Sequence, residues 1–164
     1  MPIVFIGVGS NLGDREGHLL SAKTELLACS GVRDLCCSPV YESSPVDAEG
    51  ANYLNAVWSF ETDSSPREIL AMLHEVEEKA GRVRGSKNAP RTLDLDLLFY
   101  DAKVISEPDL KVPHPRLADR AFVLVPLCDL ASEWKHPVLQ KTVRELLQRD
   151  NFKQQEIKRF SAAA

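Results

Sequence analysis

Residues 90–101 read PRTLDLDLLFYD, and their apolar side chains indicate a β-strand that enters a protein core. Asp94 and Asp96 stand two positions apart in this segment, so both side chains point to one face of the strand, about 7 Å apart. Carboxylates this close repel each other unless a cation lies between them, and their hard oxygen atoms suit Mg²⁺. Two solvated carboxylates on the outer face of a half-exposed sheet are the alternative. The apolar neighbours favour the metal site.

The same region predicts a phosphate ligand. Mg²⁺ in proteins is held by one or two carboxylates together with substrate phosphates, and the guanidinium of Arg91 suits a phosphate as well. The formal net charge is −4, which gives no reason to expect nucleic-acid binding. Basic residues nevertheless gather in two groups, whose alternative explanation is a solvated surface: Arg82, Arg84, Lys87 and Arg91, and then Arg116 and Arg120. A local basic pocket in an acidic chain favours a small polyanion.

Length and composition predict one domain over residues 1–164. The chain is 44% hydrophobic and 27% charged, which is typical of a soluble globular protein. Its four cysteines lack the spacing of a metal site, and the N-terminus lacks the pattern of a signal peptide. No apolar run approaches the roughly 20 residues that a membrane span needs. We therefore expect a cytoplasmic protein with reduced thiols and no membrane partner. We also expect a monomer, because nothing in the sequence demands an oligomer.

Periodicity and turn signals predict the order β-α-β-β-α-loop-β, which is typical of an α+β fold with a ferredoxin-like split β-α-β sheet, helices packed on one face of it and a C-terminal helical extension. The first strand is expected to end at a turn over residues 9–11, and Asn11 or Asp14 is expected to cap the first helix. Residues 160–164 are expected to fray. The predicted strands are 3–8, 32–42, 53–62 and the segment with Asp94; the predicted helices are 15–29, 66–80, 118–131 and 142–149.

Several motifs together resemble one family. Arg91-Thr92-Leu93-Asp94-Leu95-Asp96 after Ala89-Pro90 is similar to the signature of the 6-hydroxymethyl-7,8-dihydropterin pyrophosphokinases of folate biosynthesis. The other matching segments follow in the family's order over nearly the whole chain: residues 9–13 (GSNLG), 53–56 (YLNA), Glu77, 81–84 (GRVR), 112–114 (VPH) and 120–127 (RAFVLVPL). The resemblance implies transfer of the pyrophosphoryl group of ATP to the pterin hydroxymethyl oxygen, with release of AMP.

The resemblance also implies roles for individual residues. Asp94 and Asp96 would hold two Mg²⁺ ions, and Arg82 and Arg91 would act on the triphosphate during transfer. ATP, the co-substrate, would be bound by His74, Glu77, Arg84, Arg91, Leu97, Lys111, His114 and Arg120, with His74 facing the same way as Glu77, one helical turn away. The pterin would stack on Tyr53 and Phe122, bond to Asn55, and meet the loop with Ser43, Ser44 and Val46.

Two other functions fit parts of the sequence. Another Mg²⁺-dependent nucleotide enzyme, such as an ordinary kinase or a nucleotidyltransferase, would use the same carboxylate pair but release ADP or pyrophosphate in place of AMP. A ferredoxin-like ligand-binding module without catalysis would have no need of Asp94 and Asp96. The identity of the nucleotide product separates the two enzyme classes, and aspartate variants that leave ligand binding unchanged would favour the module.

Overall fold

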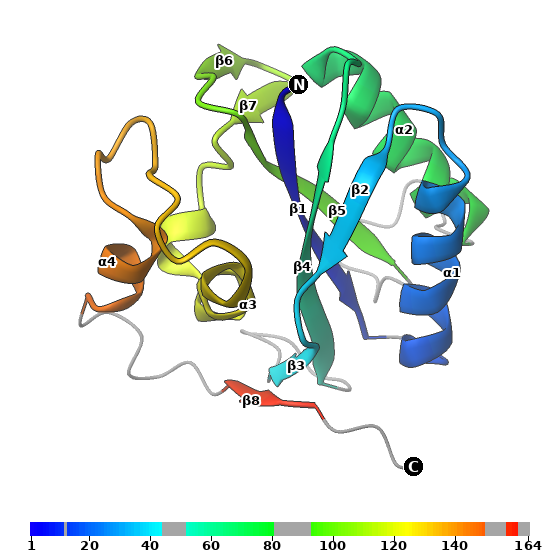
Figure 1. Ribbon diagram of the computed structural model, residues 1–164. Coiled ribbons are helices and arrows are strands. Elements are labelled where there is room, and N and C mark those ends of the chain that lie inside the picture. The colour runs from blue at the N-terminus through cyan, green and yellow to red at the C-terminus, as the bar shows by residue number, and fades with distance from the viewer. Residues whose placement is uncertain (12, 44–51, 81–92, 150–156, 161–164) are drawn as a thin grey trace.

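The computed structural model describes residues 1–11, 13–43, 52–80, 93–149 and 157–160. A twisted sheet runs through the middle of the molecule, with helices on both sides (Figure 1). The elements are β1 (Ile3–Ser10), α1 (Arg15–Leu27), β2 (Arg33–Cys37), β3 (Tyr41–Ser43), β4 (Tyr53–Glu61), α2 (Pro66–Lys79), β5 (Asp94–Tyr100), β6 (Ile105–Glu107), β7 (Leu110–Val112), the 3₁₀ turn η1 (Leu117–Asp119), α3 (Ala121–Ala131), α4 (Val143–Leu147) and β8 (Ile157–Arg159).

The main sheet has the strand order β5-β1-β4-β3-β8, with β2 also paired to β4, and each of these pairings is antiparallel. β1 therefore lies between β5 and β4, as the first strand does in a ferredoxin-like sheet. This confirms the predicted fold class. β6 and β7 form a separate hairpin, which the sequence analysis did not predict, and this hairpin leads into His114.

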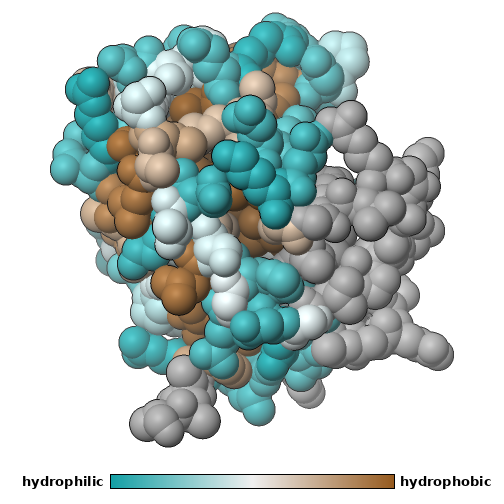
Figure 2. Space-filling view, turned by 90° about the vertical axis from the view of Figure 1, so that its right-hand side faces the viewer, coloured by the Kyte–Doolittle hydropathy of each residue, from teal (hydrophilic) through white to brown (hydrophobic). Residues whose placement is uncertain are grey.

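Each face of the sheet has its own core. The α1–α2 face buries alternate residues of β1 and β4, among them Val4, Ile6 and Phe60, against apolar residues of both helices. The opposite face buries Phe5 and Phe99 against α3 and α4. The prediction of helices on one face is therefore incomplete, because α3 and α4 cover the second face (Figure 1). The outer side formed by α1 and α2 is mostly hydrophilic, with small hydrophobic areas between (Figure 2).

Local capping explains where the first two helices begin. The Asp14 carboxylate accepts a hydrogen bond from the Gly17 N–H, and Ser65 forms a reciprocal capping box with Glu68 ahead of α2. The expected cap at Asp14 and the helix start at Pro66 are thus confirmed. No described helix is long and apolar enough to cross a membrane.

Four predictions about the ends of elements are wrong. The helix predicted over 118–131 begins only at Ala121, because residues 117–119 form the separate 3₁₀ turn η1. β1 continues through Gly9 to Ser10 in place of ending at a turn, because both residues stay paired with β4. The predicted strand 32–42 is two strands, separated at Pro39, which has no N–H to donate to a ladder. Phe160, expected to fray, donates its N–H to the Val40 carbonyl at 2.8 Å and follows β8.

Candidate active site

Two glycines form the floor of the candidate site. In β1, Gly7 pairs with Asp96 of β5 on one side, and Gly9 pairs with Asp94 on one side and Asn55 of β4 on the other. Directly paired residues of an antiparallel sheet carry side chains on the same face. The carboxylates of Asp94 and Asp96 and the amide of Asn55 therefore lie on the same face of the sheet, on either side of Gly7 and Gly9, which we call the glycine floor. A methyl group added at Gly9 would lie 3.1 Å from Asn55 Oδ1, so the Asn55 side chain would have to shift to make room for it.

The two aspartates suit a magnesium ion. Both are partly buried on the face of β5 opposite its apolar residues Leu95 and Leu97, as the alternation predicted. Among the described residues, no three His, Cys, Asp or Glu side chains gather closely enough to form a complete metal cage. A pair of carboxylates is the donor set typical of a Mg²⁺ ion whose other ligands are phosphates and water. The residues present therefore fit Mg²⁺ better than a metal held by protein ligands alone.

A polar pair lies across the glycine floor from the carboxylates. Asn55 is 7% exposed and donates from Nδ2 to the Ser43 hydroxyl at 2.7 Å. This bond turns Oδ1 of Asn55 toward Gly9 and so toward the floor. The pair thus presents an acceptor toward the floor, in a part of the sheet that excludes most water.

Glu77 of α2 bonds to the backbone of β5. It extends the buried stripe of α2 and is 1% exposed, and its Oε2 accepts the backbone N–H of Leu95 at 2.9 Å. Leu95 stands between the two aspartates, so Glu77 fixes the strand that carries them. His74, one turn earlier on α2, is exposed, and its part in binding ATP stays a prediction.

His114, which follows β7, also bonds to the backbone of β5. Its backbone N–H donates to the Leu98 carbonyl at 2.9 Å, and its Nδ1 accepts the Arg116 N–H at 3.2 Å. Burial lowers the pKa of His114 to about 4, helped by the charges of Arg120 and Arg116 and opposed by that of Asp94. The imidazole is therefore neutral at physiological pH. Since Nδ1 accepts, the proton sits on Nε2, which acts as an uncharged donor beside two cations.

The remaining predicted residues occupy different environments. The guanidinium of Arg120 lies over the Phe122 ring, 5.5 Å from its centroid, at the start of α3, and both side chains are partly exposed. Tyr53 is partly exposed at the first position of β4, paired with Ser43. Lys111 is exposed on β7. The Leu97 side chain is buried in the α1–α2 core, on the face away from Asp96, so its predicted contact with ATP is not supported for the side chain.

Five predicted site residues lie outside the described residues: Arg82, Arg84 and Arg91, and Ser44 and Val46. Sequence reasoning missed two features of the residues that the structure describes. One is the glycine floor, whose signal is two glycines at positions i and i+2 of a strand. The other is a hydrogen bond from the Tyr41 hydroxyl to the Asp129 carboxylate, which ties β3 to α3. Burial and this carboxylate raise the pKa of Tyr41 to about 12.

Comparisons with known proteins identify the family to which the chain is similar. The family profile described as 7,8-dihydro-6-hydroxymethylpterin-pyrophosphokinase (HPPK) matches residues 5–132. The 2-amino-4-hydroxy-6-hydroxymethyldihydropteridine pyrophosphokinase of Synechocystis sp. is 37% identical over 143 residues, which are 87% of this chain and 73% of that protein. The enzyme of the same name from Aquifex aeolicus is 37% identical over 146 residues, which are 88% of this chain and 90% of that protein.

A solved structure shares the fold. Wild-type HPPK-DHPS of Plasmodium falciparum superposes with a TM-score of 0.69 at 16% identity, over 96% of this chain and 48% of that one. At that identity the likeness concerns the fold alone. The chain spans about half the length of this larger protein.

Proposed function

Since the chain belongs to the 7,8-dihydro-6-hydroxymethylpterin-pyrophosphokinase family, we propose that it transfers the pyrophosphoryl group of ATP to 6-hydroxymethyl-7,8-dihydropterin. The pterin hydroxymethyl oxygen forms a bond to the β-phosphorus of ATP. The bond from that phosphorus to the oxygen bridging the α-phosphorus breaks, the hydroxyl proton is released, and AMP leaves with the α-phosphate. The products are AMP and the pterin diphosphate.

One arrangement carries the proposal: the carboxylates of Asp94 and Asp96 stand on one side of the glycine floor, and the Ser43–Asn55 pair stands on the other. We assign the phosphates to the first side and the pterin to the second. Two Mg²⁺ ions, held by Asp94 and Asp96, would neutralise phosphate charge and draw the triphosphate toward the acceptor oxygen.

The protein's own groups orient the reactants. The His114 Nε2–H can donate to a phosphate oxygen without adding a full charge, while Arg116 and Arg120 supply positive charge nearby. Oδ1 of Asn55 can accept an N–H of the pterin, and Tyr53 and Phe122 offer aromatic faces to a flat heterocycle. We assign Arg82, Arg84 and Arg91 to the triphosphate and Ser44 and Val46 to the pterin, as the family resemblance implies. We further propose that the protein acts in the cytoplasm as a monomer.

Chromatography of the nucleotide products tests the proposal. Purified protein with ATP, Mg²⁺ and the pterin should form AMP only when the pterin is present. Asp96→Asn should lose this activity by at least about a hundredfold. Asp34→Asn is the matched control, because Asp34 is an exposed aspartate on β2 with φ of 53°, which asparagine adopts readily. ADP as the product would indicate an ordinary kinase, and pyrophosphate would indicate a nucleotidyltransferase.

A further inference from the structure

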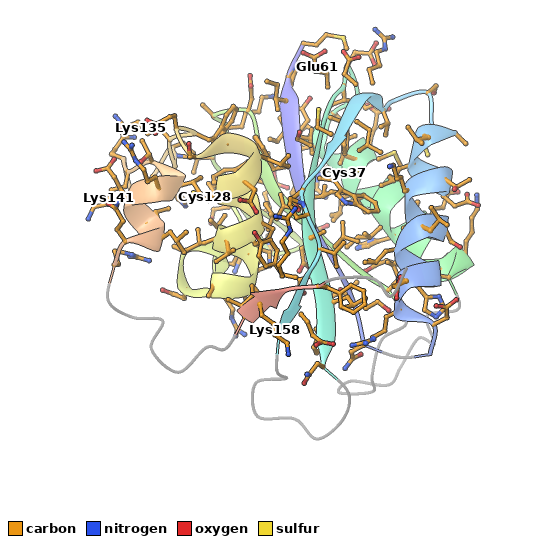
Figure 3. The ribbon with its side chains drawn as sticks, turned by 60° about the horizontal axis from the view of Figure 1, so that its bottom comes forward. Cys37, Glu61, Cys128, Lys135, Lys141 and Lys158 are labelled. Carbon is orange, nitrogen blue, oxygen red and sulfur yellow. The ribbon has the colours of Figure 1, made fainter. Side chains whose placement is uncertain are left out.

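The strand that carries Ser43 is held by the end of the chain. β3 has only three residues, and β8 pairs with all of them: Tyr41 with Arg159, Glu42 with Lys158 and Ser43 with Ile157. β8 crosses this end of the sheet between α3 and α1 (Figure 3). It lies beyond residue 132, where the match to the family profile ends. A strand this short gains little from its own ladder, so its neighbours decide where it lies.

Arg15, the first residue of α1, joins the two strands of the proposed pterin side. Its Nη1 donates to the Glu42 carboxylate at 3.1 Å and to the Asn52 carbonyl at 2.7 Å. Glu42 directly precedes Ser43, and Asn52 directly precedes β4. One nitrogen therefore connects the end of β3 to the beginning of β4.

The Arg15–Glu42 ion pair is partly buried, and Phe160 packs against it. The Arg15 and Glu42 side chains are 25% and 18% exposed, so their ion pair is less screened than a pair on an open surface. The guanidinium also lies 5.9 Å from the centroid of the Phe160 ring, directly after β8. Since Phe160 bonds to Val40, the same segment that covers the edge of β3 holds Arg15 in place.

We propose that Arg15 is a positioning residue for the pterin. By joining Glu42 to Asn52 under the cover of β8 and Phe160, it sets the register at which the Ser43 hydroxyl meets Asn55, and so the direction of Asn55 Oδ1. This inference rests on the proposed function, because the pterin is the molecule that Asn55 orients. Arg15 lies on the α1 side of β3, so it acts through the two strands and does not touch the substrate.

Steady-state kinetics of three variants test this role. Arg15→Met keeps the length of the side chain but removes the nitrogen, and it should raise the KM for the pterin about tenfold, as loss of a residue that orients another one does. The KM for ATP and kcat should stay within about twofold. Arg15→Lys should restore most of the pterin affinity, because a single nitrogen makes both contacts. Arg33→Met is the control, since Arg33 is an exposed arginine in an ion pair with Asp63 elsewhere on the surface.

A second measurement does not depend on activity. The side-chain N–H₂ signals of Asn55, followed by NMR with hydrogen exchange, should exchange faster in Arg15→Met than in the wild type and in Arg33→Met. Equal exchange, or a kcat loss with unchanged pterin KM, would overturn the positioning role. If the wild type forms no AMP, the proposed function fails, and the exchange measurement still decides whether Arg15 sets the Ser43–Asn55 pair.

Discussion

Replacing Glu77 with alanine tests the claim that a buried carboxyl group fixes the strand with the metal-binding pair. Glu77 is 1% exposed and accepts the Leu95 N–H at 2.9 Å. The alanine variant leaves this buried N–H without its acceptor, which costs about 1–3 kcal/mol. Loss of a buried methylene adds about 0.8 kcal/mol. We therefore expect the free energy of unfolding to fall by about 2–4 kcal/mol, and the midpoint of thermal unfolding to fall by about 4–16 °C.

Glu77→Gln is the matched control, since its side-chain carbonyl oxygen can accept the same N–H in nearly the same volume. It should lose less than about 1 kcal/mol. Denaturant unfolding gives both values, and hydrogen exchange of the Leu95 amide reports the bond itself, which should be protected in the wild type and in Glu77→Gln but not in Glu77→Ala. An alanine variant as stable as the wild type, with the Leu95 amide still protected, would refute this account of how β5 is held.

Three other predictions concern the residues around the glycine floor. NMR titration should find the imidazole of His114 with a pKa of about 4, and Arg120→Gln should raise that pKa. Because folding favours the neutral imidazole, the stability that His114 contributes is complete above pH 6.5 and is lost as the pH falls toward 4. His114→Gln should therefore lose less stability than the wild type over that pH interval. Asp129→Asn should lower the pKa of Tyr41 from about 12, measured by NMR titration of the phenol, although burial, the larger cause, keeps it above 10; an unchanged value would mean that the carboxylate has no part in it. Gly9→Ala should raise the KM for the pterin about tenfold, because its methyl group would lie 3.1 Å from Asn55 Oδ1. In Gly7→Ala the methyl group meets only the flexible Leu98 side chain, at 3.6 Å, so this variant should bind the pterin nearly as the wild type does.

Regular patterns in the sequence predicted the parts of the fold that depend on local preference and burial. The predicted strand 53–62 and helix 66–80 match β4 and α2 to within one residue at each end, and the apolar segment with Asp94 identifies β5. The Asp94–Asp96 arrangement follows from strand geometry alone. These features need no knowledge of distant parts of the chain.

Features that depend on tertiary pairing could not be predicted in this way. β8 is a three-residue segment, Ile157–Arg159, with two charged side chains and no hydrophobic pattern, and it is a strand only because β3 offers an unpaired edge. The burial of Glu77 has a weak signal, since position 77 continues the stripe of Ile69 and Leu73 at helical spacing. Its partner, the Leu95 N–H, lies 18 residues away and becomes apparent only in the folded chain.

The most direct test of the central claim is ³¹P NMR of the purified protein with ATP, Mg²⁺ and 6-hydroxymethyl-7,8-dihydropterin, beside the same mixture with Asp96→Ala. Signals of AMP and of a new pterin diphosphate should grow together in the wild type, and neither should appear with the variant. Unchanged ATP, ADP as the only nucleotide product, or equal turnover by Asp96→Ala would contradict pyrophosphoryl transfer at the Asp94–Asp96 face of the sheet.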